Sequence, residues 1–270
     1  MSILSLFYLM NQSLMLGIGL NATEIRQTAK PIVQTILQAK PTVPRPMDRA
    51  TKYVYLSFDD GPLFGTSACI SICKNENVKA TFFEIGLHQS RSKWGKNLYN
   101  RIVSRPDLFL LCNHSFTHTY GKYVQFYNHP DAALADFLHA AVVLKTTNNI
   151  VRLPGNNGWR TDSIRFSSKM VRPLINKLDS AGLNVVGWDL EWNFNHQGRP
   201  IQSATHMANL VDSMFAQKAN KTKNHLVVLM HDHMFKNPAD SAALVQFIQL
   251  LKSSNQYQFA LLNRYPGLKK

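Results

Sequence analysis

Ser57-Phe58-Asp59-Asp60-Gly61-Pro62 directly follows the apolar run Tyr53-Val54-Tyr55-Leu56. The β-branched and aromatic residues of the run predict a buried strand, and the Gly-Pro pair predicts a sharp turn at its end. Two adjacent carboxylates at such a strand end cost free energy unless a metal ion, another cation or a reaction engages them. Asp59 and Asp60 are therefore the first candidate functional residues.

Strands and helices alternate along the chain on the C-terminal side of this stretch. Such alternation over about 220 residues predicts a parallel α/β fold. We expect strands at 53–58, 80–85, 108–112, 150–153, 183–190, 225–230 and 256–262, and helices at 67–77, 92–104, 131–145, 168–181, 203–218 and 241–252.

Two features favour an α/β barrel over a doubly wound sheet. No Gly-rich phosphate loop follows the first strand. Polar side chains instead recur at the carboxyl ends of several strands, which in a barrel converge on one mouth where active sites lie. The sequence therefore predicts a barrel with its site at that mouth. The polar residues are Asp59, Asp60, His114, Arg152, Asp189, Glu191 and His231.

Composition places the chain among globular proteins, because 45% of its 270 residues are hydrophobic and 17% are charged. The excess of 30 Lys and Arg over 16 Asp and Glu gives a formal net charge of +14. The basic residues are scattered and form no nucleic-acid-binding module, so we expect a solvated basic surface and no nucleic-acid partner. Attraction to an anionic cell envelope is compatible with that surface. Cys69, Cys73 and Cys112 match no zinc module and are expected to be buried free thiols.

The first 50 residues differ from the rest of the chain. Residues 1–22 are mostly apolar, and Leu20-Asn21-Ala22 resembles a cleavage site. This pattern predicts a signal peptide or an N-terminal anchor. The alternative is an ordinary amphipathic helix. Residues 23–50 are polar and Pro-rich and predict an extended linker. Residues 51–270 are the expected catalytic domain. A secreted, periplasmic or cell-envelope location follows, with membrane association through residues 1–22.

His114 and His118 are four residues apart, so on a helical turn they would share a face. With Asp60 as the third ligand, they form a two-histidine, one-carboxylate set for a divalent metal, with positions left for water. No glutamate follows His114, which argues against the His-Glu-x-x-His protease motif. Asp59 is then placed to act as a base toward water.

Arg152 and His231 are candidates for the other roles. A guanidinium at a strand end can hold a carboxylate bidentately, and a histidine that ends an apolar strand can protonate a leaving group. Asp189 and Glu191 alternate on one predicted strand, so both face the same way and either could orient His231. The ordinary alternatives are a surface ion pair for Arg152 and a satisfied core histidine for His231.

Five segments, in order, resemble the motifs of the NodB-type polysaccharide deacetylases, carbohydrate esterase family 4. The first segment, with its Asp-Asp-Gly-Pro core, is the most specific. Two departures are visible: Gly155-Asn156-Asn157 stands where the family usually has an aromatic residue, and the fourth motif is shortened. The five segments are 57–62, 114–118 (His-Ser-Phe-Thr-His), 152–154 (Arg-Leu-Pro), 189–192 (Asp-Leu-Glu-Trp) and 229–231 (Leu-Met-His).

The resemblance implies a distorted (β/α) barrel of the NodB-homology type and a zinc site, with Co²⁺ or another transition metal as alternatives. The implied reaction removes an acetyl group, foremost an N-acetyl group, from a polysaccharide or glycan. The resemblance implies that Asp59 is the base and that Arg152 holds it. It implies that His231 is the general acid, with Asp189 or Glu191 as its partner. The implied metal ligands are Asp60, His114 and His118.

A carbohydrate deacetylase with an acetylated polysaccharide as its partner is thus the leading expectation. A non-catalytic glycan-binding relative of the same fold is the alternative, because the third and fourth motifs are altered. A non-haem iron oxygenase also uses two histidines and one carboxylate, but the strand-helix rhythm and the carboxylate doublet argue against it. The sequence leaves open the glycan, the linkage of the acetyl group, the native metal and the oligomeric state.

Overall fold

The structure is a computed structural model that describes residues 51–269. The expected leader, residues 1–22, and the expected linker, residues 23–50, lie outside the described residues. Within the described part, none of the helices has the length and apolar character needed to cross a membrane. The three cysteines are buried free thiols, as predicted.

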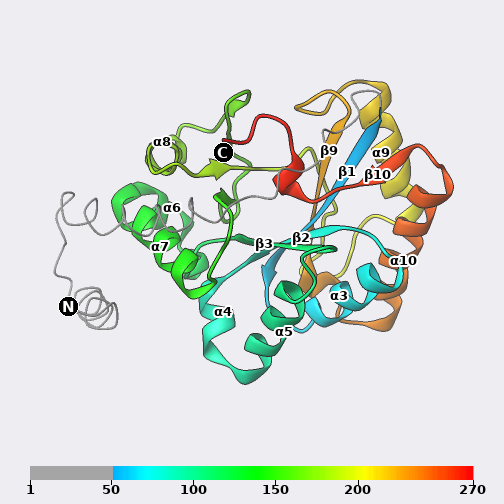
Figure 1. Ribbon diagram of the computed structural model, residues 1–270, viewed down its shortest axis with the longest axis horizontal. Helices are drawn as coiled ribbons and strands as arrows, with labels where there is room; N and C mark the ends of the chain where they lie inside the picture. The colour runs from blue at the N-terminus through cyan, green and yellow to red at the C-terminus, as the bar shows by residue number, and fades with distance from the viewer. Residues whose placement is uncertain (1–50, 270) are drawn as a thin grey trace.

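One ten-stranded sheet, parallel at its centre, runs through the molecule (Figure 1). Its strands are β1 (Lys52–Gly61), β2 (Ala80–Glu84), β3 (Phe109–Asn113), β4 (Ile150–Val151), β5 (Trp159–Arg160), β6 (Arg165–Phe166), β7 (Asn184–Val185), β8 (Leu190–Glu191), β9 (His225–His231) and β10 (Tyr257–Phe259). The order is β6-β5-β7-β4-β3-β2-β1-β9-β8, and β10 pairs with the start of β1. The end strands of this order, β6 and β8, do not pair with each other. The sheet therefore forms the predicted distorted barrel, left open, in a single domain.

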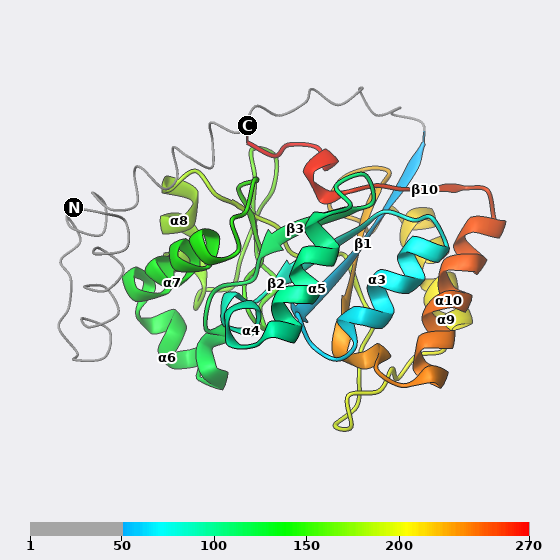
Figure 2. The ribbon, with the colours of Figure 1, turned by 60° about the horizontal axis from the view of Figure 1, so that its bottom comes forward.

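Helices connect successive strands and cover the outer face of the sheet (Figure 2). Serine side chains cap two of them in the way that satisfies free backbone N–H groups: Ser92 accepts from Gly95 N, and Ser203 from His206 N. The α-helices are α3 (Thr66–Asn75), α4 (Gly86–Arg91), α5 (Lys93–Val103), α6 (Tyr123–Asn128), α7 (Pro130–Val143), α8 (Arg172–Ser180), α9 (Ala204–Ala216) and α10 (Pro238–Ser253), and the 3₁₀ helices are η1 (His118–Gly121), η2 (Asp232–Phe235) and η3 (Leu262–Arg264).

The alternation of side chains along β1 divides the core into two parts. Leu56 and Phe58 belong to the outer cluster, which includes residues of α3, α5, α9 and α10. Tyr53 and Tyr55 belong to the inner cluster. Successive side chains of a strand point to opposite faces, so Asp59 continues the inner row at the carboxyl end of the strand. The inner face is thus apolar at one end of the sheet and carries a carboxylate at the other.

The C-terminal segment fills the amino-terminal end of the inner face. The ring of Tyr265 lies 5.3 Å from that of Tyr55 and 5.4 Å from that of Trp159, and Leu262 is fully buried in the same cluster. This packing places polar inward-facing groups at the carboxyl end, where a barrel of this type has its active site.

Most predicted elements are present, but the predicted strand at 183–190 is wrong in its middle. It forms two short strands, β7 and β8, with an irregular stretch between them. The carbonyl oxygens of Val186 and Gly187 in this stretch accept hydrogen bonds from the buried guanidinium of Arg152, so a side chain takes the place of a strand partner there. The elements α4, α6, β5 and β6 were not predicted. Each has at most six residues, too few for a periodic pattern.

Candidate active site

Asp59 and Asp60 point in different directions because β1 is irregular between them. The register of β1 with β2 shifts between Asp59 and Gly61, so Asp60 forms a bulge, and its φ of 76° is left-handed. Bulges and left-handed non-glycine residues often re-aim side chains at functional sites. The bulge lets two neighbouring carboxylates contact different partners.

Asp59 is held by Arg152, and both side chains are buried. The Nη1 atom of Arg152 donates to Asp59 Oδ1 at 2.8 Å and to Ser57 Oγ at 2.8 Å. Its other nitrogens donate to the carbonyls of residues 186–187, and the guanidinium lies 4.0 Å from the centre of the Phe83 ring. A surface ion pair is therefore the wrong interpretation of Arg152. The buried guanidinium is satisfied and fixes the orientation of Asp59.

Asp60 converges with two histidines. Its Oδ1 atom lies 3.0 Å from His118 Nε2 and 3.4 Å from His114 Nε2. The Nδ1 atom of His114 lies 3.0 Å from the carbonyl oxygen of Arg152, which makes Nδ1 the donor and leaves Nε2 with a lone pair in the neutral ring. Burial alone would raise the pKa of Asp60, but the two histidines hold it well below its usual value.

This convergence fits a metal ion. The ligand atoms of Asp60, His114 and His118 lie within 4.8 Å of one another, and Asp60 Oδ1 is buried without a hydrogen-bond partner among the described residues. The lone pair of a neutral histidine and a carboxylate oxygen repel each other at this distance. A cation bound between them removes the repulsion. Two imidazoles and one carboxylate suit zinc and related divalent ions, and the carbonyl behind His114 is the kind of outer partner that such ligands have.

The two histidines do not lie on a helical turn, so that prediction is wrong. A loop after β3 carries them, with left-handed φ angles at Ser115 (71°) and His118 (49°). The Ser115 side chain accepts from His118 N at 3.0 Å, and Ser115 N donates to Asn113 Oδ1 at 2.8 Å. Local hydrogen bonds thus fold the loop so that the rings lie 5.1 Å apart.

Asp136 of α7 holds the same loop from outside. Its Oδ2 atom accepts from the backbone N–H groups of Phe116 at 2.8 Å and Thr117 at 3.2 Å. The neighbouring carbonyl of Phe137 accepts from Asn113 Nδ2 at 2.8 Å. Sequence reasoning missed Asp136, because nothing in its local pattern distinguishes it from a solvated helix residue.

His231 ends β9 beside Asp59. The two residues are direct partners in the parallel pairing of β1 with β9, so their side chains leave the sheet on the same face. His231 is half-buried, and its Nδ1 atom has no hydrogen-bond partner among the described residues. The Phe194 ring packs against His231 at 4.9 Å and against His233 at 4.7 Å.

Asp189 and Glu191 lie in different surroundings. Both Asp189 oxygens accept backbone N–H groups, Oδ1 from Lys221 at 2.7 Å and Oδ2 from Val227 at 2.9 Å. Glu191 lies on β8 opposite Leu229, two residues before His231. Burial raises the pKa of Glu191, and the charge of His231 counteracts this. Of the two carboxylates, Glu191 is therefore the one placed to interact with His231.

Tyr123 places an aromatic ring beside Gly155, where the sequence itself has no aromatic residue. A Cβ atom added to Gly155, whose φ is 60°, would lie 2.7 Å from the Tyr123 ring. The same ring packs edge-on against His118 at 5.9 Å. Position 155 is therefore small because an aromatic side chain from α6 occupies the adjoining space.

A second pair of carboxyl groups lies buried beneath the Asp60 turn. A Cβ atom added to Gly61 would lie 2.5 Å from Glu84 Oε1 and 2.6 Å from Asp232 Oδ2. Burial, together with the nearby charge of Asp232, raises the pKa of Glu84 well above its usual value. Burial likewise raises the pKa of Asp232 to about 8. Two such groups avoid mutual repulsion when at least one is protonated.

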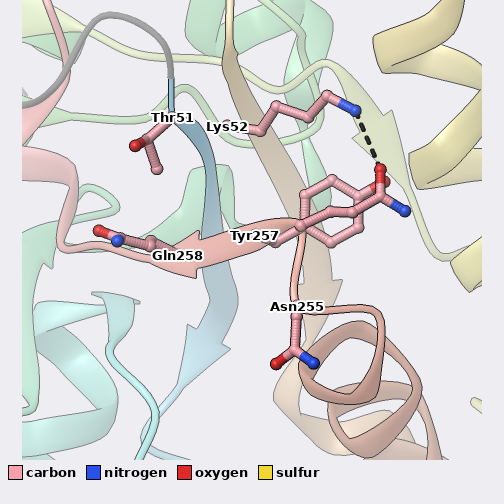
Figure 3. A pocket seen from close by; sticks show the side chains of 6 residues that line it. Thr51, Lys52, Asn255, Tyr257 and Gln258 are labelled. Carbon is pink, nitrogen blue, oxygen red and sulfur yellow. Dashed lines mark hydrogen bonds between the residues drawn. The ribbon is translucent and has the colours of Figure 1, made fainter.

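A shallow hollow at the opposite end of the sheet has no chemistry of this kind (Figure 3). It lies where β10 joins the start of β1, and Lys52 Nζ donates there to Gln256 Oε1 at 3.2 Å. Its lining comprises Thr51, Lys52, Asn255, Gln256, Tyr257 and Gln258.

Comparison with known proteins shows which proteins the chain resembles. The sequence model described as polysaccharide deacetylase matches residues 47–149. The chain is 26% identical over 224 residues to the peptidoglycan-N-acetylglucosamine deacetylase of Bacillus cereus, covering 77% of this chain and 68% of that protein.

Two solved structures share the fold. The catalytic domain of peptidoglycan N-acetylglucosamine deacetylase from Eubacterium rectale has a TM-score of 0.59 and 26% identity, over 85% of this chain and 97% of that one. A carbohydrate esterase family 4 esterase from Streptococcus mutans also has a TM-score of 0.59, with 20% identity, over 85% and 90% of the two chains.

Fold and site together are those of an α/β protein that resembles the polysaccharide deacetylases. The resemblance to the NodB-type deacetylases of carbohydrate esterase family 4 is confirmed by the family match and by these structures. The matched relatives are deacetylases, that is, hydrolases.

Proposed function

We propose that this protein is a metal-dependent hydrolase that removes acetyl groups, foremost N-acetyl groups, from a glycan. The observation that carries the proposal is the convergence at one end of the sheet. The Asp59–Arg152 pair, the metal-binding set and His231 lie on neighbouring strand ends. The relatives named as peptidoglycan N-acetylglucosamine deacetylases favour an N-acetylglucosamine-containing polymer as the substrate class.

Asp60, His114 and His118 are the residues that would hold the metal, which we propose to be zinc, with cobalt as an alternative. When bound, such an ion polarises an acyl carbonyl and lowers the pKa of water. The chain supplies the remaining chemistry through its own side chains.

Asp59 accepts the proton of the attacking water on the carboxylate oxygen that Arg152 leaves available. Arg152 occupies Oδ1, whereas Oδ2 faces the metal-binding set at 3.6 Å from His114 Nε2. His231, on the neighbouring strand, donates a proton to the departing amine or alcohol. Glu191, which lies opposite Leu229 on β9 and hence on the same face of the sheet as His231, is the carboxylate that orients this imidazole.

The alternative is a glycan-binding relative without turnover, in which the rebuilt third and fourth motifs have removed catalysis. Every side chain required for the proposed reaction is present at the site, and this supports catalysis over binding alone.

We also propose that the protein acts in the cell envelope or outside the cell, since its proposed substrate is there. The leader that would direct it, residues 1–22, lies outside the described residues.

The test is acetate release from chitin oligomers, peptidoglycan, acetylxylan and poly-N-acetylglucosamine, with zinc or cobalt and again with a chelator. We expect metal-dependent release from a glycan that carries N-acetylglucosamine. The Asp59→Asn variant is the matched control. Sugar binding without release, in a folded and metal-loaded protein, would establish the alternative instead.

A further inference from the structure

Two large aromatic side chains lie against each other at the surface. Phe64 is 79% exposed and Trp94 is 41% exposed, and their ring centres are 5.0 Å apart with 40° between the planes. Exposed aromatic side chains that gather in this way typically mark a binding surface, because leaving them in water costs free energy.

Phe64 is presented by a closed turn between β1 and α3. Leu63 N donates to Thr66 Oγ1 at 2.7 Å, and Thr66 N donates to the Leu63 carbonyl at 3.1 Å. A Cβ atom added to Gly65 would lie 1.7 Å from the carbonyl oxygen of Asp232. The turn is therefore packed directly on the residue that follows the proposed general acid.

Trp94 lies in the first turn of α5 and is connected to the other half of the site. A Cβ atom added to Gly95 would lie 2.4 Å from the His88 carbonyl oxygen, so the start of α5 packs on α4. The Nδ1 atom of His88 lies 2.9 Å from the carbonyl oxygen of Asp60. The aromatic pair thus adjoins both the metal-binding turn and the His231 end of β9.

We propose that Phe64 and Trp94 form a stacking platform for a pyranose ring of the glycan, next to the sugar that is deacetylated. This inference rests on the proposed function. The C–H faces of sugar rings pack on aromatic rings, and two rigid rings offer such a face at little entropic cost. Two side chains are far too small for a stable protein interface, which needs about 800 Å² on each partner. The platform predicts a preference for oligomeric over short substrates.

The test compares Phe64→Ala, Trp94→Ala and the double variant on chitin pentamer and chitin dimer. We expect KM for the pentamer to rise about three- to tenfold in each single variant, with kcat unchanged and the dimer kinetics unaffected. Phe166→Ala is the matched control. Phe166 lies on β6 and is 50% exposed. The ammonium group of Lys221 lies over its ring. Because Lys221 precedes β9, Phe166 lies at the end of the sheet opposite the site.

Calorimetric titration of the metal-free protein with chitin pentamer gives a readout that does not depend on catalysis. Weaker binding in the two variants and unchanged binding in Phe166→Ala would support the platform. Unchanged KM for the pentamer and unchanged pentamer binding in the double variant would overturn the platform. A change in sedimentation without a change in KM would also overturn it, because the aromatic pair would then mediate self-association. If the wild type released no acetate from any glycan, the proposed function would fail, and the titration alone would decide on the platform.

Discussion

At the residue scale, one bulge gives two neighbouring carboxylates different contacts. Asp59 stays in the inner row of β1 and contacts Arg152, whereas Asp60 turns toward His114 and His118. In a regular strand, adjacent side chains point to opposite faces. Without the bulge, Asp60 would therefore point into the outer apolar layer. The bulge keeps both carboxylates at the same end of the sheet.

Asp59→Asn should lower acetate release by about 10²–10⁴-fold, because an amide cannot accept the proton of water. Asparagine keeps an oxygen for Arg152, and Asp59 is not in the metal-binding set, so metal affinity should change little. Acetate release and zinc titration of the same preparation check this. Activity within tenfold of the wild type would rule out Asp59 as the base.

Glu191→Gln and Asp189→Asn should have different effects. We expect Glu191→Gln to lower kcat by about tenfold or more, because Glu191 lies on the same face of the sheet as His231 and is the carboxylate proposed to orient it. Asp189→Asn should instead lower the free energy of unfolding, since an amide offers one oxygen where the carboxylate accepts two backbone N–H groups. Kinetics and urea unfolding of both variants separate the roles, and the reverse pattern would exchange them.

At the element scale, α7 stabilises a loop that it does not adjoin in sequence. The loop from Ser115 to Tyr120 contains four non-glycine residues with left-handed φ, a conformation that is costly unless its surroundings hold it. Asp136 of α7 accepts hydrogen bonds from the loop backbone, and Asn113 donates one to the Phe137 carbonyl of α7; these bonds provide that support. The position of the two histidines is therefore set by packing of the loop on a helix.

Asp136→Ala should weaken zinc affinity by about ten- to a hundredfold, as is typical of groups that support metal ligands. Competition with a chromophoric chelator measures this without catalysis, and the visible spectrum of the cobalt form reports the ligand geometry. Asp131→Ala is the matched control, because Asp131 lies on the same helix but pairs with Lys177 at the surface. Equal zinc affinity in both variants would contradict the role of Asp136.

At the scale of the whole molecule, the buried Glu84–Asp232 pair makes stability depend on pH. The pKa of both groups is raised in the folded protein, that of Asp232 to about 8. Between about pH 4 and pH 8 the folded state then binds more protons than the unfolded chain, so the free energy of unfolding falls as pH rises through this window.

Glu84→Gln should remove part of this dependence, because an amide does not ionise. Relative to the wild type, we expect the variant to gain about 1–3 kcal/mol at pH 8 and little or nothing at pH 4. Urea unfolding with a chelator present excludes metal effects. Glu76→Gln is the control of opposite sign, since the hydrogen bond from Lys252 lowers the pKa of Glu76 and its contribution is lost as pH falls. A pH-independent difference for Glu84→Gln would falsify the assignment.

The sequence by itself determined the fold class, the positions of most long elements and which polar residues gather at the carboxyl end of the sheet. It could do so because each residue ends or follows a strand of apolar periodicity, and parallel strands bring their carboxyl ends to one edge. Asp59, Asp60, His114 and Arg152 were predicted in this way, whereas His118 was predicted from its spacing to His114.

Only the tertiary structure decided how those residues are held. The loop geometry of His114 and His118, the support from Asp136, the ring of Tyr123 beside Gly155 and the separation of Asp189 from Glu191 all depend on contacts between residues distant in sequence. Local periodicity carries no information about such contacts, because they arise when separate elements pack and satisfy each other's polar groups.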